Sequence, residues 1–263
     1  MKKLGKLAAI GLAGAVILAS AGCTDTVGSN VQPPDTVTET TTQEDYGISV
    51  GDHIRFGNYP QKNASDPEPV MWRVLEIKDG KALVISEYLL EPYVYNVEPA
   101  DVTWENSSIR KWLNGKFFDA AFSDSEKSII QNVTVKNSDN PIYGTPGGND
   151  TEDKVFCLSL EEVQIYFADA GDRMTAPTEY AVSRGASVSD DKTLANGMKT
   201  GWWWLRTPAS SANRAADVDC YGNIDTVRIE GGVDGDIVFS EGNCVRPAVW
   251  IQITDDIVKS KCV

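Results

Sequence analysis

Two rigid, apolar segments frame a long polar one near the carboxyl end of the chain, and this contrast constrains the fold most. The first segment, "GWWWLRTP", begins at Gly201, and the second, "VRPAVWIQI", begins at Val245. The residues between them are rich in Asp, Gly, Ser and Asn and carry isolated Val and Ile side chains. Apolar segments are usually buried and polar loops lie on the surface, so this pattern predicts a polar segment displayed on a rigid support.

The residues before this region mix strands with short helices. "PVMWRVLEI" and "KALVISEYLL", joined by Asp79-Gly80, predict a hairpin with a tight turn. "WENSSIRKWLNGKFFDAAF" has helical spacing, with Ser107 or Ser108 as the cap and Gly115 weakening or ending the helix.

Two serines, Ser123 and Ser159, stand three residues before a glutamate, the spacing of a capping box that opens a helix. We expect the second of these helices to reach Phe167, and a further short one at about 178–183. "NVTV" and the continuously apolar "KVFCLSL" predict strands, and everything after Gly201 is expected to be strands and loops. Strands, then helices, then strands again predict an α+β fold.

The amino terminus indicates export. A basic start precedes the apolar run Leu7–Leu18, which is too short to span a bilayer as a mature helix and fits a signal peptide. The run ends in "SAGC", which resembles a bacterial lipobox with Cys23 as the lipidated residue. Cleavage of an ordinary signal peptide at these small residues is the alternative. We predict a lipoprotein signal peptide over residues 1–22 and a lipid anchor on the extracellular face of a bacterial membrane.

Residues 23–45 are rich in Thr, Asp, Glu and Pro and have few large apolar side chains. Such a segment cannot offset its ordering entropy by burial, so we predict a disordered tether. Residues 46–263 contain neither a second linker nor an internal repeat. They are predicted to form a single α+β domain.

The charge balance excludes some partners. The net charge is −14, and removal of the three signal lysines lowers it to about −17. This acidity argues against nucleic acid, whose phosphates need Lys and Arg, and against electrostatic membrane binding. Contact with the membrane is therefore expected only through Cys23.

The cysteines and the single histidine exclude several kinds of site. No short Cys pair of the zinc-ribbon type occurs. Cys157 is interpreted as a core residue, whereas Cys220 and Cys244 can pair outside the cell only if the fold brings them close. His53 is predicted to be an exposed strand residue rather than a base, and a multi-histidine metal site is excluded.

Eight ordered motifs resemble a family of secreted bacterial domains with no assigned biochemical function. They are "FGNYPQ", "WRVLEI", "WENSSIRKWLN", "FFDAAFSDSEKSII", "DKVFCLSLEEVQIYF", "PTEYA", "WWLRTP" and "VRPAVWI". The carboxy-terminal half is more distantly similar to the C-type-lectin-like fold of formylglycine-generating enzymes and of the variable proteins of diversity-generating retroelements.

This resemblance implies that Trp202–Arg206 and Val245–Ile251 are adjacent core strands. It also implies that Arg206 and Arg246 pair with carboxylates or bond loop carbonyls, a structural role that their planar guanidinium groups suit better than catalysis.

Residues 207–245 contain no Lys, Gln, Met or Trp, and their only glutamates are Glu230 and Glu241. Replacement of adenines in Asn codons, as diversity-generating retroelements perform it, would produce this depletion if both glutamates are template positions. A Gly- and Asp-rich turn region that is Lys-poor by chance is the alternative.

We therefore predict an extracellular ligand-binding module, adhesin or lectin-like, for a protein or glycan ligand. Around Val218, Ile224, Val227 and Ile229, apolar side chains are expected to point inward and polar ones to solvent, with Tyr221 as an aromatic anchor at a turn. The predicted contacts are Arg214, Asp217, Asp219, Tyr221, Asn223, Asp225, Arg228, Asp234 and Asp236.

Two other functions stay open: a formylglycine-generating-type enzyme, whose reactive cysteine spacing Cys220 and Cys244 do not reproduce, and a structural envelope protein that binds nothing specific. We predict no catalytic residue, cofactor or metal. Calcium is the exception that we weigh, because five aspartates between Asp217 and Asp236 offer oxygen ligands without EF-hand spacing.

Overall fold

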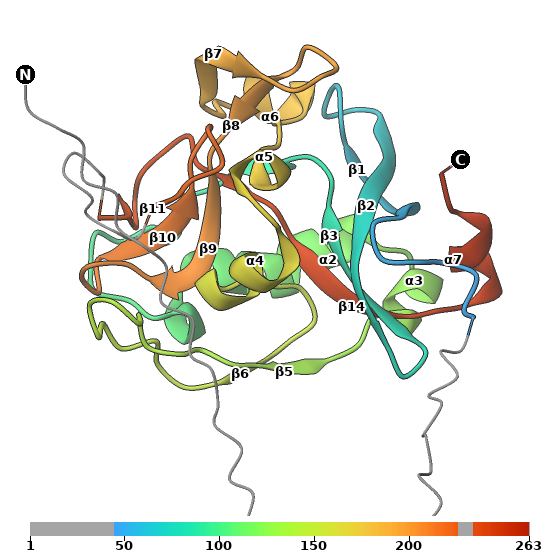
Figure 1. Ribbon diagram of the computed structural model, residues 1–263, viewed down its shortest axis with the longest axis horizontal. Coiled ribbons are helices and arrows are strands. Elements are labelled where there is room, and N and C mark those ends of the chain that lie inside the picture. The colour runs from blue at the N-terminus through green and yellow to red at the C-terminus, as the bar shows by residue number, and fades with distance from the viewer. Residues whose placement is uncertain (1–44, 226–233, 263) are drawn as a thin grey trace, which may run out of the picture. The chain divides into compact units, whose positions relative to one another are not determined.

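The folded unit comprises Glu44–Val263, and the computed structural model describes residues 45–225 and 234–262 (Figure 1). The signal peptide, nearly all of the tether and Arg228 lie outside the described residues. In the described part of the chain, no helix has the length and apolar character needed to cross a membrane. The unit combines several sheets with short helices, which confirms the predicted α+β class.

The first sheet is antiparallel and has the order β1-β2-β3-β14. Its strands are β1 (His53–Pro60), β2 (Pro67–Lys78), β3 (Lys81–Ser86) and β14 (Ala248–Gln252). The predicted hairpin joins β2 to β3, and its two turn residues, Asp79 and Gly80, have φ values of 50° and 71°. Two consecutive positive φ values characterise the type I′ turn that Asp-Gly favours, so this prediction is confirmed.

The second sheet has the order β11-β10-β9-β13-β4, and β12 also pairs with β10. Its strands are β4 (Glu91–Pro92), β9 (Trp203–Pro208), β10 (Arg214–Val218), β11 (Ile224–Asp225), β12 (Asp236–Ile237) and β13 (Cys244–Val245). Two small sheets pair β5 (Val133–Val135) with β6 (Thr151–Asp153) and β7 (Val188–Thr193) with β8 (Lys199–Gly201).

The second apolar segment, "VRPAVWIQI", contributes to both large sheets. β13 pairs in parallel with β9 through Cys244 and Trp203, so the predicted adjacency holds only at the very start of this segment, where Val245 ends β13. It is wrong beyond Arg246, because β14 pairs with β3 in the other sheet. Pro247 lies at this crossing, where its carbonyl accepts a hydrogen bond from the Ser86 amide at 2.9 Å. A proline has no N–H to donate, so this position suits the end of one ladder and the start of another.

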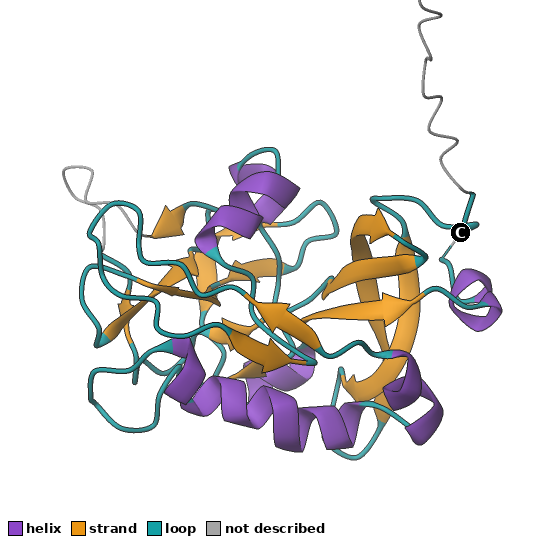
Figure 2. Ribbon diagram, turned by 90° about the horizontal axis from the view of Figure 1, so that it is seen from below, coloured by secondary structure: helices purple, strands orange, loops and turns teal. Residues whose placement is uncertain are grey.

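Short helices pack beside the sheets, and the longest helical stretch runs along one side of the strands (Figure 2). The helices are η1 (Trp104–Asn106), α1 (Ser108–Trp112), the π-helix η2 (Leu113–Phe117), α2 (Phe118–Ala121), α3 (Asp124–Ile129), α4 (Leu160–Tyr166), α5 (Ala170–Arg173), α6 (Glu179–Ser183) and α7 (Asp255–Lys259).

The helix starts follow the sequence closely. Ser107 caps α1, and capping boxes at Ser123 and Ser159 open α3 and α4, as predicted. Gly115 does not end its helix but lies inside the π-helical turn, where the regular i→i−4 pattern is interrupted. Helix α7 contradicts the expectation of only strands and loops after Gly201.

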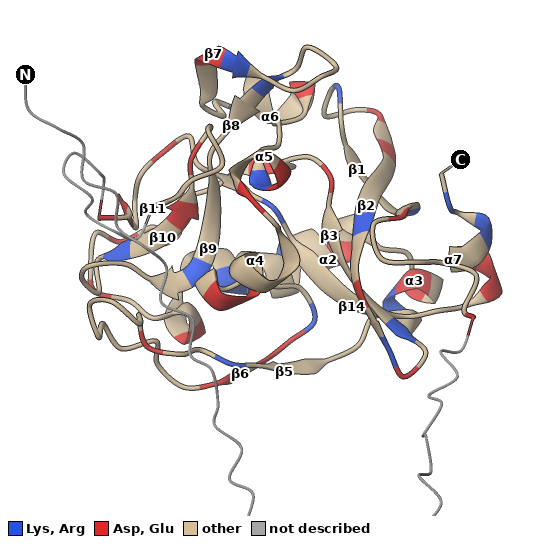
Figure 3. Ribbon diagram, viewed as in Figure 1, with Lys and Arg blue, Asp and Glu red and all other residues tan. Residues whose placement is uncertain are grey.

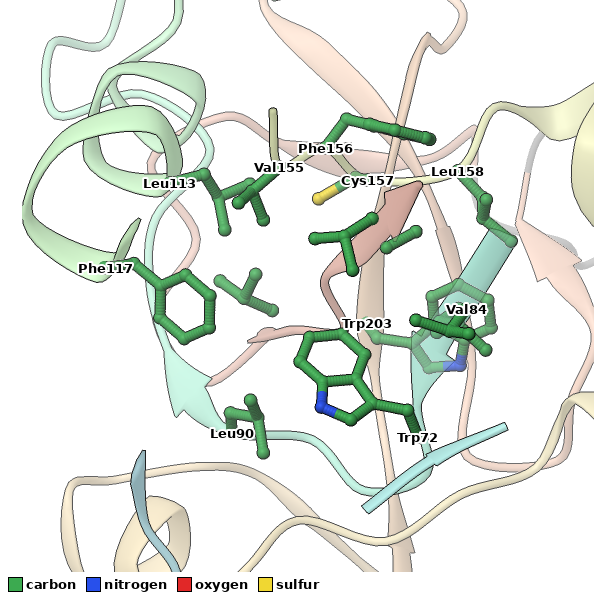
Figure 4. Close-up of a cluster of buried hydrophobic side chains, with 14 of the residues drawn as sticks. Trp72, Val84, Leu90, Leu113, Phe117, Val155, Phe156, Cys157, Leu158 and Trp203 are labelled. Carbon is green, nitrogen blue, oxygen red and sulfur yellow. The ribbon is translucent and has the colours of Figure 1, made fainter. Parts of the chain in front are cut away.

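The predicted strand "KVFCLSL" is also wrong. Val155–Leu158 is buried, but only Phe156 forms a bridge, with Ala248. A buried apolar run can fill the interior without joining a ladder. Cys157 is a core residue as predicted, and it lies in the apolar cluster that also contains Trp72 and Trp203 (Figure 4).

Candidate functional site

The predicted contact residues separate into two groups at opposite ends of β10. Asp219, Tyr221 and Asn223 lie in the turn that leads to β11, which we call the tip turn (Asp219–Asn223). Arg214 and the Asp234–Asp236 segment lie at the other end, where β12 pairs with β10. A strand rises about 3.3 Å per residue, so the two groups are separated by roughly the length of β10 and do not form one patch.

Asp219 organises the tip turn. Its Oδ1 accepts hydrogen bonds from the amides of Tyr221 and Asn223, both at 2.8 Å, and its Oδ2 accepts one from Asn223 Nδ2 at 3.0 Å. The Asp219 amide donates back to the Asn223 carbonyl at 2.9 Å. Asp219 therefore holds the conformation of the turn, while the Tyr221 residue stays 42% exposed.

Strand β7 contributes two side chains beside Tyr221 that the sequence analysis did not single out. The Tyr221 hydroxyl donates to Asp191 Oδ1 at 3.1 Å, and this hydrogen bond raises the pKa of Tyr221. Lys192 Nζ lies 5.2 Å from the centre of the Tyr221 ring, within range of a cation–π interaction. These residues lie about thirty positions apart in the chain, so no local pattern could have linked them.

Helix α5 packs against the tip turn at Gly222. Gly222 has a φ of 79°, and a Cβ at this position would lie 1.8 Å from the Ala170 carbonyl oxygen. Arg173 Nε donates to the Gly222 carbonyl at 2.7 Å. Figure 3 shows α5 carrying acidic and basic residues side by side. Gly222 is therefore required by both backbone conformation and close approach.

At the other end of β10, the side chains of Arg214, Asp234 and Asp236 form hydrogen bonds within the domain. Arg214 Nη1 donates to the Gly235 carbonyl at 2.6 Å. Asp234 Oδ1 accepts from the Tyr143 hydroxyl at 3.1 Å, and Asp236 Oδ2 accepts from Asn243 Nδ2 at 3.2 Å. Arg214 thus ties β10 to the residue before β12, whereas Asp234 and Asp236 bind residues of other segments.

Asp217 does not face solvent, contrary to the expected alternation. It is only 2% exposed, and its neighbours Ala216 and Val218 are buried as well. The register between β10 and β9 shifts between Ala215 and Asp217. Such an irregularity breaks the alternation of side chains that the sequence analysis assumed. The side chain of Asp225 lies outside what the structure describes.

The described residues contain no cluster of three or more His, Cys, Asp or Glu side chains that could hold a metal ion. All four described cysteines are free thiols. Burial raises the pKa of Cys157 to about 12, and it also raises the pKa of Cys244. A protonated, buried thiol is a poor nucleophile.

Arg206 has the bracing role that we expected. Its guanidinium forms a two-pronged ion pair with Glu162, in which Nη2 lies 2.9 Å from Oε1. Nη1 also donates to the Cys157 carbonyl at 2.9 Å, and Nη2 to the Lys136 carbonyl at 3.1 Å. The side chain thereby ties β9 to α4 and to two loops.

Arg246 is also structural, but its surroundings differ. Nε donates to the Ser86 carbonyl at 3.0 Å and Nη1 to the Arg173 carbonyl at 3.3 Å. Arg246 therefore bonds backbone carbonyls as predicted, but these carbonyls lie at the ends of β3 and α5 rather than in loops. The guanidinium carbon lies 5.0 Å from the centre of a Trp203 ring and 5.3 Å from that of Phe167. Burial lowers the pKa of Arg246 to about 9.

A network of charges lies at the edge of the first sheet. His53 Nε2 lies 3.0 Å from Glu87 Oε2, and Arg73 binds both Glu87 oxygens at 2.8 and 2.9 Å. Arg73 Nη1 also donates to Asp172 of α5 at 3.0 Å. The His53 side chain is 33% exposed, so it is partly buried rather than exposed as predicted.

The pKa of Glu87 reflects this network. Burial opposes its ionisation, but hydrogen bonds from His53 and Arg73 outweigh burial and lower the pKa to about 2. A cavity of about 340 Å³ lies beside the network and is lined in part by His53, Arg73 and Asp172. The network connects strand β2 to α5, which in turn supports the tip turn.

Comparison with known protein families identifies the family of this chain. Residues 79–253 match the family described as Domain of unknown function (DUF6273). The chain belongs to the DUF6273 family. This confirms the expected membership of a family without assigned function. No curated protein and no solved structure matches the chain.

The match to DUF6273 begins at Asp79 and therefore leaves β1 and β2 outside it. Both strands nevertheless complete the sheet to which the matched β3 and β14 belong. In this protein the folded domain is thus larger than the matched region. The tip turn lies inside the match, whereas His53 and Arg73 lie outside it.

Proposed function

We propose that this DUF6273 protein is a lipid-anchored extracellular module that binds a protein or glycan through the tip turn. The observation that carries the proposal is the geometry around Tyr221, an exposed aromatic side chain on a turn held by Asp219 and by α5. A rigid aromatic group loses little conformational freedom when it binds, so it contributes affinity efficiently.

The buried strands β9 and β13 support the same function, because they give the exposed turn a rigid base. Arg206 and Arg246 are engaged by neighbouring groups inside the fold and serve as braces. The distant C-type-lectin-like relationship of the carboxy-terminal half is part of this proposal. It is supported by the adjacency of β9 and β13, which carry the "WWLRTP" motif and the start of "VRPAVWI".

The location rests on the amino-terminal sequence. The apolar run and "SAGC" support lipidation at Cys23, and the polar composition of residues 24–45 suits a spacer between membrane and domain. Labelling of cells with a radioactive fatty acid tests this: wild type is expected to incorporate label and C23A to lose it. Equal labelling of both would contradict the anchor.

The binding test compares two exposed tyrosines at opposite ends of β10. Protein and glycan arrays are probed with the mature protein, and each hit is measured with Tyr221→Ala and Tyr143→Ala. Tyr143 is 38% exposed and is therefore a matched control. Loss of a central aromatic contact costs about 2 kcal/mol or more, so Tyr221→Ala is expected to weaken binding about 30-fold.

Tyr143→Ala should retain the affinity of wild type. Equal loss in both variants, or loss in Tyr143→Ala alone, would contradict a site at the tip turn. Absence of any saturable ligand would instead favour a structural envelope protein.

A further inference from the structure

A second cavity lies away from the tip turn, where three separate segments meet. Its volume is about 300 Å³, and it is lined by Pro92–Val94 at the end of β4, by Arg184-Gly185 at the end of α6 and by Glu241-Gly242 before β13. This size is at the lower end of ligand cavities, which span about 300–1,000 Å³. It suits a ligand of one or two small rings.

Tyr93 is the aromatic residue that lines this cavity, and Trp112 packs against it. The rings of Tyr93 and Trp112 are stacked, with centres 4.8 Å apart and planes 24° apart. The Tyr93 backbone is fixed as well: its amide donates to the Asn243 carbonyl at 3.1 Å, and its carbonyl accepts from Trp204 Nε1 at 2.8 Å. The half-buried Tyr93 is therefore positioned before any ligand arrives.

Opposite charges stand at the rim. The Arg184 side chain is 59% exposed, and its Nε lies 3.5 Å from Glu91 Oε1. Glu91 is itself buried and accepts a hydrogen bond from the Tyr59 hydroxyl at 2.9 Å, so it anchors Arg184 from inside the fold. Glu241 is exposed and forms no ion pair within the described residues. The rim therefore offers a donor-only guanidinium and an acceptor-only carboxylate.

Each part of this arrangement matches a part of a sugar ring. The faces of aromatic rings are electronegative and attract the polarised C–H groups on the flat side of a pyranose. Hydroxyl groups both donate and accept, so one sugar can satisfy Arg184 and Glu241 together. An anionic ligand would meet the carboxylate of Glu241, with that of Glu91 close behind Arg184. We propose that this cavity is a binding site for a neutral saccharide, independent of the tip turn.

The test uses the mature protein and neutral tetrasaccharides of glucose, mannose and N-acetylglucosamine as probes, with an oligogalacturonate as the anionic comparison. Calorimetric titration is carried out up to about 10 mM, which detects even weak binding. At least one neutral probe is expected to bind. Glu241→Gln and Arg184→Gln should each weaken that binding about tenfold, because a charged hydrogen bond is lost.

Two further variants, Tyr93→Ala and Tyr221→Ala, separate the alternatives. Tyr93→Ala should abolish binding, and its fold is checked by circular dichroism. Glu241→Gln keeps shape and is exposed, so it tests the site even if Tyr93→Ala unfolds. Tyr221→Ala should bind the saccharide as wild type does.

Three outcomes would overturn this inference. The first is the failure of every neutral probe to bind, and the second is tighter binding of the anionic probe. The third is loss of saccharide binding in Tyr221→Ala with no change in Glu241→Gln. The third result would place the sugar on the tip turn, so the proposed function would stand and the separate saccharide site would fall.

Discussion

The tip turn follows β10, which pairs with β9, yet different interactions stabilise the tip turn and strand β9. Trp203, Trp204 and Leu205 of β9 are fully buried, whereas Tyr221 in the tip turn is 42% exposed. Burial of apolar surface and the ion pair of Arg206 stabilise β9. Hydrogen bonds from Asp219 and contact with α5 hold the tip turn. Changes in β9 should therefore alter stability, and changes in the tip turn should alter binding.

The two arginines of the framing motifs sharpen this contrast. Arg206 has a carboxylate partner, Glu162. Among the described residues, Arg246 donates hydrogen bonds to backbone carbonyls alone, and it lies against Trp203 and Phe167. A buried arginine without a directly bonded carboxylate depends on the surrounding rings and carbonyls to hold its charge. Trp203 is thus both a core residue and a neighbour of a buried cation.

The largest effect is expected for Trp203→Ala. This change removes a fully buried indole and should cost about 3–5 kcal/mol of unfolding free energy, measured by urea denaturation. Trp250→Ala on β14 is the control, because Trp250 is only partly buried and should cost less. If Trp203→Ala had the same urea denaturation midpoint as wild type, β9 would not be part of the stabilising core.

Arg206→Ala is expected to cost about 3 kcal/mol, because it removes the cation paired with Glu162 and the donor to two backbone carbonyls. The comparison is Arg184→Ala: the Arg184 side chain is 59% exposed, and its buried partner Glu91 keeps the hydrogen bond from Tyr59, so the loss should be smaller, about 1 kcal/mol. The measurement is again chemical denaturation. Equal losses of unfolding free energy in the two variants would mean that burial of an arginine does not determine its contribution to stability here.

The lowered pKa of Glu87, a carboxylate near Arg246, predicts that the domain loses stability in acid. Its folded-state pKa of about 2 lies below the ordinary value of 4.5, so the carboxylate contributes stability above pH 4.5 that is lost as the pH falls towards 2. The contribution is roughly 3–4 kcal/mol, because the pKa falls from 4.5 to about 2 and each pKa unit corresponds to about 1.4 kcal/mol.

Glu87→Gln is expected to lower the unfolding free energy at pH 7 and to flatten its decline between pH 4.5 and 2. Denaturation curves at several pH values measure both effects. An unchanged pH dependence in Glu87→Gln would contradict the role of the His53–Arg73–Glu87 network.

The smallest effect on stability is expected for Tyr221→Ala, within about 0.5 kcal/mol, because an exposed side chain on a turn contributes little to the core. Its melting temperature should equal that of wild type. If Tyr221→Ala melted early while Trp203→Ala stayed folded, the roles of the tip turn and β9 would be exchanged.

Features encoded within a few neighbouring residues were predictable from the sequence. Asp79-Gly80 predicted its turn because Gly, and Asp more readily than most residues, tolerate a positive φ. Ser123 and Ser159 predicted helix starts because each cap is completed by a glutamate three residues later. The burial of Trp203–Leu205 followed from hydrophobicity alone.

Tertiary structure decided the features that depend on distant partners. Asp217 is buried because the β9–β10 register shifts, and Tyr221 meets Asp191 because two hairpins pack together. The cavity beside Tyr93 brings together segments from positions 92 to 242. Local patterns specify backbone conformation and hydrophobic faces, but they do not specify which distant strand comes alongside, because that choice depends on the packing of the whole core.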